Sequence, residues 1–191
     1  MALERSARTL RYDDLFDLPD DGRRYEIVEG ELFELPAPGL LHALVVSNLM
    51  WLLAGIVRAM KGTIVTAPVD VFFRGADPVE PDVVVLLPGG TARPSRRGVE
   101  GPPDLLIEVL SPSTRGRDLL MKRMLYARAG VREYWIVDPD ARTVDEHTLD
   151  VDVFREPVTV GGDGRVVSPL LATELAAAEV FAGLDEAPDE G

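Results

Sequence analysis

Two carboxylic acids, Asp82 and Glu108, stand where an ionised side chain is costly. Asp82 opens an otherwise apolar run at 82–87, and Glu108 lies inside another at 104–110. Such runs predict strands buried on both faces, in which a carboxylate needs a partner or a metal ion. Two unit charges about 4 Å apart repel by roughly 4 kcal/mol at an effective dielectric of about 20. If the strands are neighbours, a cation that prefers hard oxygen ligands, Mg²⁺ or Mn²⁺, would remove this repulsion.

Both acids also have a structural interpretation. Asp82 follows Pro81 and could be a turn residue at the start of a strand. Glu108 could form a buried ion pair, for example with an arginine. The sequence leaves the metal site and these structural roles open.

Lys122 is the third candidate, and it lies in a predicted helix at 115–129. At about 100° per residue, its neighbours include Leu125 and Tyr126, so this helix face is not freely solvated. We expect Tyr126 itself in the core or in a pocket wall. The lysine could supply a positive charge to a reaction site, or it could snorkel to solvent or pair with Asp118.

The elements that must position these residues predict an α/β (α+β) domain, with one mixed sheet and a helix on each side. The apolar stretch at 40–60 predicts a buried core helix rather than a membrane span, because polar residues such as His42 and Arg58 interrupt it. The other predicted elements are a hairpin at 24–35, strands at 63–67, 69–74, 82–87, 104–110 and 132–137, and antiparallel pairs of 142–147 with 151–154 and of 158–160 with 165–167.

Positive charge is concentrated in one segment of an acidic chain. The formal net charge is −13, yet 91–132 holds nine Arg or Lys against four Asp or Glu. This segment includes a predicted loop of about 16 residues at 88–103, and loops of that length tend to be functional or mobile. Six arginines of the segment at 91–132 could contact phosphates or form a solvated surface. They are Arg93, Arg96, Arg97, Arg115, Arg117 and Arg123.

Missing residues exclude several other chemistries. The chain has no cysteine, which excludes disulfides and a thiol nucleophile. With two histidines, a structural zinc site is not expected. Motifs of P-loop nucleotidases, HExxH metalloproteases and GxSxG hydrolases are absent. The N-terminal residues lack the apolar core of a signal peptide, so we expect a cytoplasmic protein.

Several segments occur together in an order that resembles a known family. They are 24–35, His42, Pro81-Asp82-Val83, the run EVLSPST that begins at Glu108, Lys122 with Tyr126, and GVREYWIVDP at 130–139. Over roughly residues 9–181 this combination resembles the Uma-type restriction endonuclease family, within the PD-(D/E)XK nuclease-like superfamily.

The resemblance implies a restriction-endonuclease-like core with flanking helices and an N-terminal β-hairpin. It also implies that Asp82, Glu108 and Lys122 are catalytic, and that the two acids bind the metal with the backbone carbonyl of Val109. The superfamily usually carries its lysine two residues after the second acid, where this chain has Leu110. The lysine would then come from the following helix.

Two more residues match recurring positions of the family and are possible accessory residues, Glu31 and His42. Glu31 could belong to the metal or water shell, or it could face solvent in the hairpin. His42 could equally be a capping or core histidine.

The resemblance implies a Mg²⁺- or Mn²⁺-dependent endonuclease that hydrolyses phosphodiester bonds, most of all in DNA. It would act as a homodimer, and no membrane partner is expected. The alternative is a catalytically inactive binding or regulatory module of the same fold, since a net charge of −13 opposes nucleic-acid binding. We expect residues 1–184 to form the domain and 185–191 an acidic, disordered tail.

Overall fold

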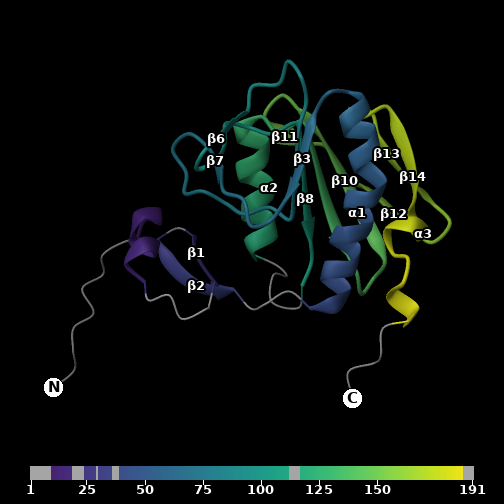
Figure 1. Cartoon of the computed structure of the whole chain (residues 1–191), viewed down its shortest axis with the longest axis horizontal. Helices are drawn as coiled ribbons and strands as arrows, with labels where there is room; N and C mark the ends of the chain where they lie inside the picture. Colours follow the sequence, from purple (N-terminus) through teal and green to yellow (C-terminus); the bar gives the residue numbers. More distant parts are fainter. Residues whose placement is uncertain (1–9, 19–23, 29, 36–38, 112–116, 187–191) are drawn as a thin grey trace.

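The chain folds around one mixed sheet (Figure 1). The computed structural model describes residues 10–18, 24–28, 30–35, 39–111 and 117–186. In chain order the elements are η1 (Tyr12–Asp17), β1 (Arg24–Val28), β2 (Glu31–Leu35), α1 (Leu40–Ala59), β3 (Thr63–Thr66), β4 (Val71–Phe72), β5 (Val83–Leu86), β6 (Arg93–Ser95), β7 (Gly98–Glu100), β8 (Leu105–Val109), α2 (Arg117–Ala129), β9 (Glu133–Asp138), β10 (Thr143–Asp150), β11 (Val153–Phe154), β12 (Val158–Gly161), β13 (Arg165–Ser168), β14 (Thr173–Ala176), α3 (Ala177–Val180) and η2 (Leu184–Glu186).

Seven strands form the main sheet in the order β11-β10-β9-β8-β5-β3, with β12 also paired to β10. β5 runs antiparallel to β8, and β8 runs parallel to β9. Helix α2 lies in the connection between the two parallel strands, which need a crossover rather than a tight turn. The predicted mixed sheet is confirmed.

Side chains of β5 and β8 alternate between two cores, because successive residues of a strand point to opposite faces. Val83 and Ile107 pack in the core that contains α1, whereas Val84 and Leu106 pack in the core that contains α2. Every residue of these two strands is buried. The two apolar runs are therefore confirmed as strands covered on both faces, with a helix on each side of the sheet.

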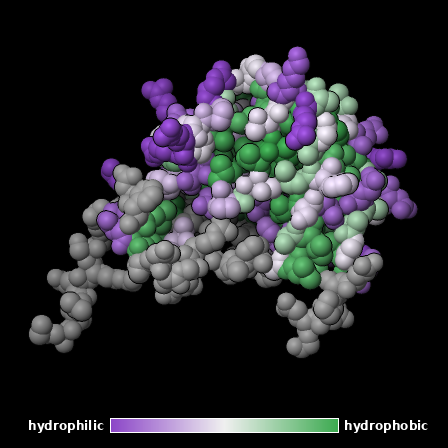
Figure 2. All heavy atoms as spheres, in the orientation of Figure 1, coloured by the Kyte–Doolittle hydropathy of each residue, from purple (hydrophilic) through white to green (hydrophobic). Residues whose placement is uncertain are grey.

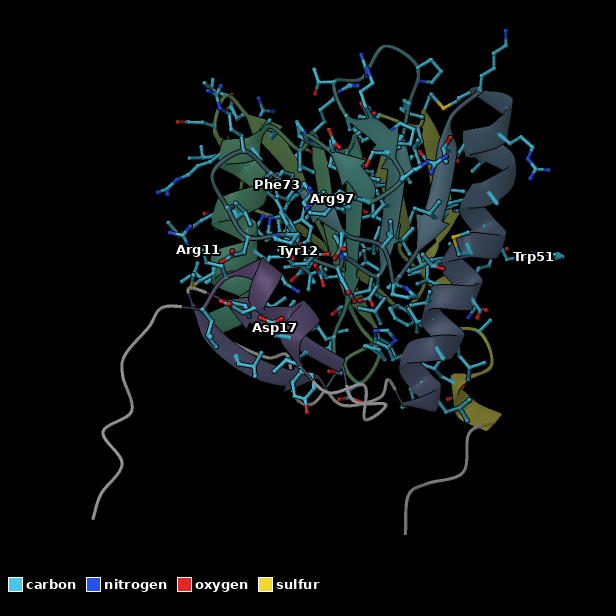
Figure 3. All side chains as sticks on the ribbon, turned by 60° about the vertical axis from the view of Figure 1, so that its left-hand side comes forward. Arg11, Tyr12, Asp17, Trp51, Phe73 and Arg97 are labelled. Atoms are coloured by element: carbon cyan, nitrogen blue, oxygen red, sulfur yellow. The ribbon has the colours of Figure 1, made fainter. Side chains whose placement is uncertain are left out.

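Helix α1 differs from the predicted core helix. Its fully buried residues form one stripe, Val45, Leu49, Leu53 and Val57, while Trp51 is 88% exposed and points away from the body (Figure 3). By length and composition α1 could cross a membrane, and 22% of its most apolar window is buried in the fold. Apolar residues surround this helix, but the described part of the chain covers only one side of it.

The N-terminal hairpin forms as predicted, with Val28 opposite Glu31. The preceding η1 connects it to the core, because the Tyr12 hydroxyl donates to Asp70 and the Tyr12 ring meets Phe72 edge-on. Burial and the Asp70 carboxylate raise the pKa of Tyr12 to about 12. The phenol thus stays protonated near neutral pH and continues to donate its hydrogen bond.

The prediction of a loop at 88–103 is wrong, because this segment contains a short β6–β7 hairpin that pairs with β4. Gly98 makes the close approach possible. Its φ is 141°, and a Cβ at this position would lie 2.2 Å from the backbone oxygen of Asp70. The predicted strand at 69–74 is correspondingly shorter and covers only β4.

Two predicted hairpins near the C-terminus differ from the structure. β10 continues to Asp150, so its turn begins at Val151, which has a positive φ of 63°, later than predicted. The segments 158–160 and 165–167 do not pair with each other, because β12 joins β10 and β13 pairs with β14. The turn at 161–164 does reverse the chain, but a glycine-rich turn specifies only local direction.

The predicted tail is described as far as Glu186, and 187–191 lie outside the described residues. Asp185 belongs to η2 and its carboxylate pairs with Arg142. The boundary at 184 and the tail at 185–191 stay a prediction, although η2 includes Asp185 and Glu186.

Glu133, at the start of β9, is a buried carboxylate that connects the sheet to the C-terminal segment. The Ser168 hydroxyl donates to it at 2.7 Å and the Leu170 amide at 2.6 Å. Burial raises the pKa of Glu133 by more than these hydrogen bonds lower it. An acid with a raised pKa in the folded state costs stability while ionised, and this cost is relieved as the pH falls through the folded pKa.

We predict that Glu133→Gln is at least as stable as the wild type at pH 7. As the pH falls from neutral toward the ordinary glutamate pKa of 4.5, the wild type should gain stability relative to the variant, because only the wild type takes up a proton at this buried position. Urea unfolding at several pH values measures the difference. The exposed Glu174→Gln is the control, and its stability relative to the wild type should not change with pH. A difference between the wild type and Glu133→Gln that stays constant over this pH range would contradict the prediction.

Candidate active site

The register of β5 and β8 brings Asp82 and Glu108 to the same end of the sheet. Val83 pairs with Ile107, so the two acids are the next residues of the two antiparallel strands. The Asp82 carboxylate accepts a hydrogen bond from the Val109 amide at 2.7 Å. The first acid therefore lies against the backbone that directly follows the second, and the expected juxtaposition of the two strand ends is present.

Helix α1 adds a histidine to the first acid. His42 lies in the first turn of α1, and its Nε2 is 3.1 Å from Oδ1 of Asp82. The two side chains are 14% and 17% exposed, so both can still be reached from solvent. This contact places His42 at the candidate site rather than in a helix cap.

Helix α2 supplies two partners to the second acid. Lys122 Nζ lies 3.3 Å from Oε2 of Glu108, and the Tyr126 hydroxyl donates to Oε1 at 2.7 Å. All three residues are buried. From the sequence, Tyr126 is expected only in the core or in a pocket wall. Its spacing of four residues from Lys122 is the signal that places both residues on one helix face.

Both acids have a basic partner, and the buried ion pair considered for Glu108 is made with a lysine rather than an arginine. Glu108 has the Lys122 ammonium, and Asp82 has the His42 imidazole. Lys122 is neither snorkelling nor confined to the helix surface, because its Nζ is held in the interior. The side chain of Asp118, its alternative partner, lies outside the described residues. Strand sequences alone do not reveal such bases, because they come from the flanking helices.

Some predicted phosphate-binding arginines have structural contacts. Arg93 donates to two backbone carbonyl oxygens just before β6, and Arg123 donates to two at the end of β11. Both guanidinium groups therefore hold the backbone. Arg115 and the side chain of Arg117 lie outside the described residues.

The tip of the β6–β7 hairpin carries Arg96 and Arg97 close to the segment that joins β3 to β4. β3 ends opposite Val83, and Asp70, four residues after β3, accepts a hydrogen bond from the hairpin. Arg97 lies over the Phe72 ring at 4.6 Å from its centroid, close to η1 (Figure 3). Arg96, the residue before Arg97, is exposed.

Two further predicted site residues lie at strand ends, Glu31 in β2 and Val109 in β8. Glu31 begins β2, and its side chain lies outside the described residues. Val109 contributes its amide to Asp82, and the role of its carbonyl as a metal ligand stays a prediction.

The two carboxylates suit a hard divalent cation. Mg²⁺ is usually held through one or two carboxylates, with water and substrate phosphates as the other ligands. Among the residues that the structure describes, no three His, Asp or Glu side chains gather into a metal-binding group. Each carboxylate oxygen can accept more than one contact. The hydrogen bonds described above therefore still leave the carboxylate oxygens of Asp82 and Glu108 able to bind a cation. The residues fit an open magnesium site better than a closed zinc site.

An acidic pocket of about 210 Å³ lies between the N-terminal hairpin and the core. Glu80, two residues before Asp82, forms part of its wall. Its carboxylates would repel phosphate, so a nucleic acid is not expected to enter here. The lining residues are Tyr12, Leu15, Tyr25, Ile27, Asp70, Asp77, Pro78 and Glu80.

Comparison with known proteins identifies the family. Residues 12–179 match the model of the Uma2 family, described as "Putative restriction endonuclease". The chain belongs to the Uma2 family. The predicted resemblance is thereby confirmed, and it places this Uma2 protein among nuclease-like proteins.

A solved structure shows the same fold as this Uma2 protein. It is a protein from Anabaena variabilis ATCC 29413 described as a putative nuclease belonging to DUF820. The two structures agree with a TM-score of 0.69 over 88% of this chain and 96% of the other, at 22% sequence identity. No curated protein matches the sequence.

We predict that Lys122→Met lowers the free energy of unfolding by about 3–5 kcal/mol, because it leaves the Glu108 carboxylate buried without a counter-charge. The double variant Glu108→Gln/Lys122→Met should recover most of this loss. Urea unfolding at pH 7 measures both values. The exposed Lys61→Met is the control and should change stability by no more than about 0.5 kcal/mol. Wild-type stability in Lys122→Met would mean that the carboxylate is not held as a buried ion.

Proposed function

We propose that this Uma2 protein is a metal-dependent nuclease that hydrolyses phosphodiester bonds, with DNA as its main substrate. The observation that carries the proposal is the meeting of Asp82, Glu108 and the buried Lys122 at one end of the sheet. Two acids from adjoining strands and a base from a helix lie at the same end of the sheet, where a purely structural ion pair needs only one acid and one base.

The use of lysine at position 122 supports a chemical role. The chain has twenty basic residues, and only Lys61 and Lys122 are lysines. Arginine is the better residue for a structural buried ion pair, because its planar fork binds a carboxylate through two N–H groups. A compact ammonium is better suited to a small reaction site. A buried lysine in an arginine-rich chain is therefore more easily explained by chemistry than by stability.

Asp82 and Glu108 would hold Mg²⁺ or Mn²⁺, with the Val109 carbonyl as a further ligand and Glu31 as a candidate for the surrounding water shell. When bound, the cation would supply Lewis-acid stabilisation of the phosphate charge and a water of lowered pKa. The acids provide the hard oxygen donors that this requires.

The helices would orient and complement these acids. His42 contacts Oδ1 of Asp82 and so sets the direction of that carboxylate, and Tyr126 does the same for Oε1 of Glu108. Lys122 places a positive charge where negative charge grows on the phosphate oxygens. Such fixed charges act strongly in a water-poor site, because they need no rearrangement during the reaction.

Binding of DNA needs a locally positive surface, because the whole chain carries a charge of −13. Arg96 and Arg97 at the hairpin tip are proposed to contact phosphates, together with Arg115 and Arg117 between β8 and the first turn of α2. Arg93 and Arg123 are less suited, since both already hold backbone carbonyl groups.

A catalytically inactive binding or regulatory module is the second candidate. The observation in its favour is that Lys122 and Tyr126 contact both oxygens of Glu108. In an active nuclease these contacts must leave room for the cation. In an inactive module they would be permanent, and the site would bind no metal.

We predict that the purified protein cleaves plasmid or single-stranded DNA with Mg²⁺ or Mn²⁺ and not with EDTA, and that RNA is cleaved more slowly. Asp82→Ala and Glu108→Ala should lose both cleavage and Mn²⁺ binding measured by calorimetry. Lys122→Met should lose at least about 100-fold in cleavage rate but retain Mn²⁺ binding, because an ammonium is no metal ligand. Thermal melting checks that each variant is folded.

Lys61→Met is the matched control and should cleave at the wild-type rate. Unchanged Mn²⁺ binding in both folded acid variants would contradict the site. A wild type that neither binds Mn²⁺ nor cleaves any of the substrates would favour the inactive module.

A further inference from the structure

One face of α1 exposes small and apolar side chains that no other described part of the chain covers. These residues recur every three or four positions, so they form one stripe along the helix. Trp51 is 88% exposed and Leu40 60% exposed, and Figure 2 shows hydrophobic side chains gathered toward the beginning of α1. Exposed apolar patches of this kind mark interaction surfaces. We call this face the α1 stripe: Leu40, Ala43, Ser47, Trp51, Gly55 and Arg58.

The α1 stripe carries no negative charge, and its one hydroxyl group already has a hydrogen-bond partner. The Ser47 hydroxyl donates to the Ala43 carbonyl at 2.8 Å, so it needs no other partner. Helix α1 contains no Asp or Glu, although the chain carries a net charge of −13. Two copies of such an acidic chain therefore repel each other least when they approach along this face.

The shape of the α1 stripe is self-complementary. Trp51 projects from the helix, and Gly55, one turn later, leaves a gap in which even an added Cβ would meet nothing within 4 Å. In a two-fold interface, residue i contacts residue j and residue j contacts residue i. An antiparallel pair of α1 helices would seat each Trp51 indole over the Gly55 of the other copy.

The same pairing matches charges. It places Arg58 opposite Asn48 of the second copy, because these positions are equally far from the centre of the pair. Asn48 donates to the carbonyl groups of Val180 and Ala182 at 3.1 and 2.9 Å, so the exposed Glu179 lies close by. Within the described residues Arg58 has no ion pair of its own. In the dimer it would meet Glu179 of the second copy.

We propose that the α1 stripe is the interface of a homodimer in which two copies pair through antiparallel α1 helices. A 20-residue helix is about 30 Å long. Burying two Trp51 side chains supplies roughly 300–500 Å² of the ~1,600 Å² that a stable interface buries. A lipid surface is a poorer match, because helices that bind membrane surfaces are rich in Lys and Arg, and α1 carries one such residue, Arg58. The dimer goes beyond the proposed nuclease activity and does not depend on it.

Sedimentation equilibrium over a range of protein concentrations tests the proposal. The wild type should be dimeric at micromolar concentration. Trp51→Glu should weaken the dimer by at least about 30-fold. Gly55→Leu should weaken it as strongly but leave the melting temperature unchanged or higher, because leucine favours a helix and the added side chain meets open space. Val158→Glu, an exposed apolar position in β12, is the control and should leave the dimer intact.

A charge exchange tests the geometry itself. Arg58→Glu and Glu179→Arg should each weaken the dimer, and the double variant should restore it, because only a contact between copies makes the two changes compensate. A monomeric wild type, or a dimer that persists in Trp51→Glu, would overturn the proposal. Wild-type binding to phosphatidylcholine and phosphatidylglycerol vesicles without self-association would assign the α1 stripe to lipid instead and overturn it equally.

Discussion

Antiparallel pairing of β5 with β8 is the contact on which the remaining structure depends. Its side chains fill both cores, with Val83 and Ile107 on one face and Val84 on the other. The same register brings Asp82 and Glu108 to one end of the ladder. A slip of one residue would turn every side chain to the opposite face. Such a slip of β8 would direct the Glu108 carboxylate into the apolar core under α1. The apolar burial that fixes the register of the two strands therefore also fixes the positions of the two acids.

The two helices complete the site as well as the cores. α1 contributes His42 to Asp82, and α2 contributes Lys122 and Tyr126 to Glu108. Each acid thus has its own polar partners, on opposite sides of the sheet. Buried ion pairs add little net stability compared with apolar side chains of similar size. Their presence here is better explained by what the charges can do at the sheet end, where the acids retain access to solvent through Asp82.

Helix α1 links this site to the outer surface of the protein. One side of it packs on the sheet through Val45 and Leu49, its first turn holds His42 against Asp82, and its outer side carries Trp51. A helix is stiff over such a length, so a partner bound to the α1 stripe would also restrict the element that positions the histidine. The described part of one chain leaves the apolar outer side of α1 uncovered.

The sequence by itself determined the elements whose signals are local. Continuous apolar runs identified β5 and β8, glycine and proline bounded the helices, and the cost of burying charge singled out Asp82 and Glu108. Tertiary structure decided which groups meet: that Lys122 and Tyr126 share one carboxylate, that β12 joins β10 rather than β13, and that Trp51 faces outward. The reason is physical. Periodicity and turn propensity act over a few residues, whereas pairing partners are selected by register and burial between segments far apart in the chain, which no local pattern encodes.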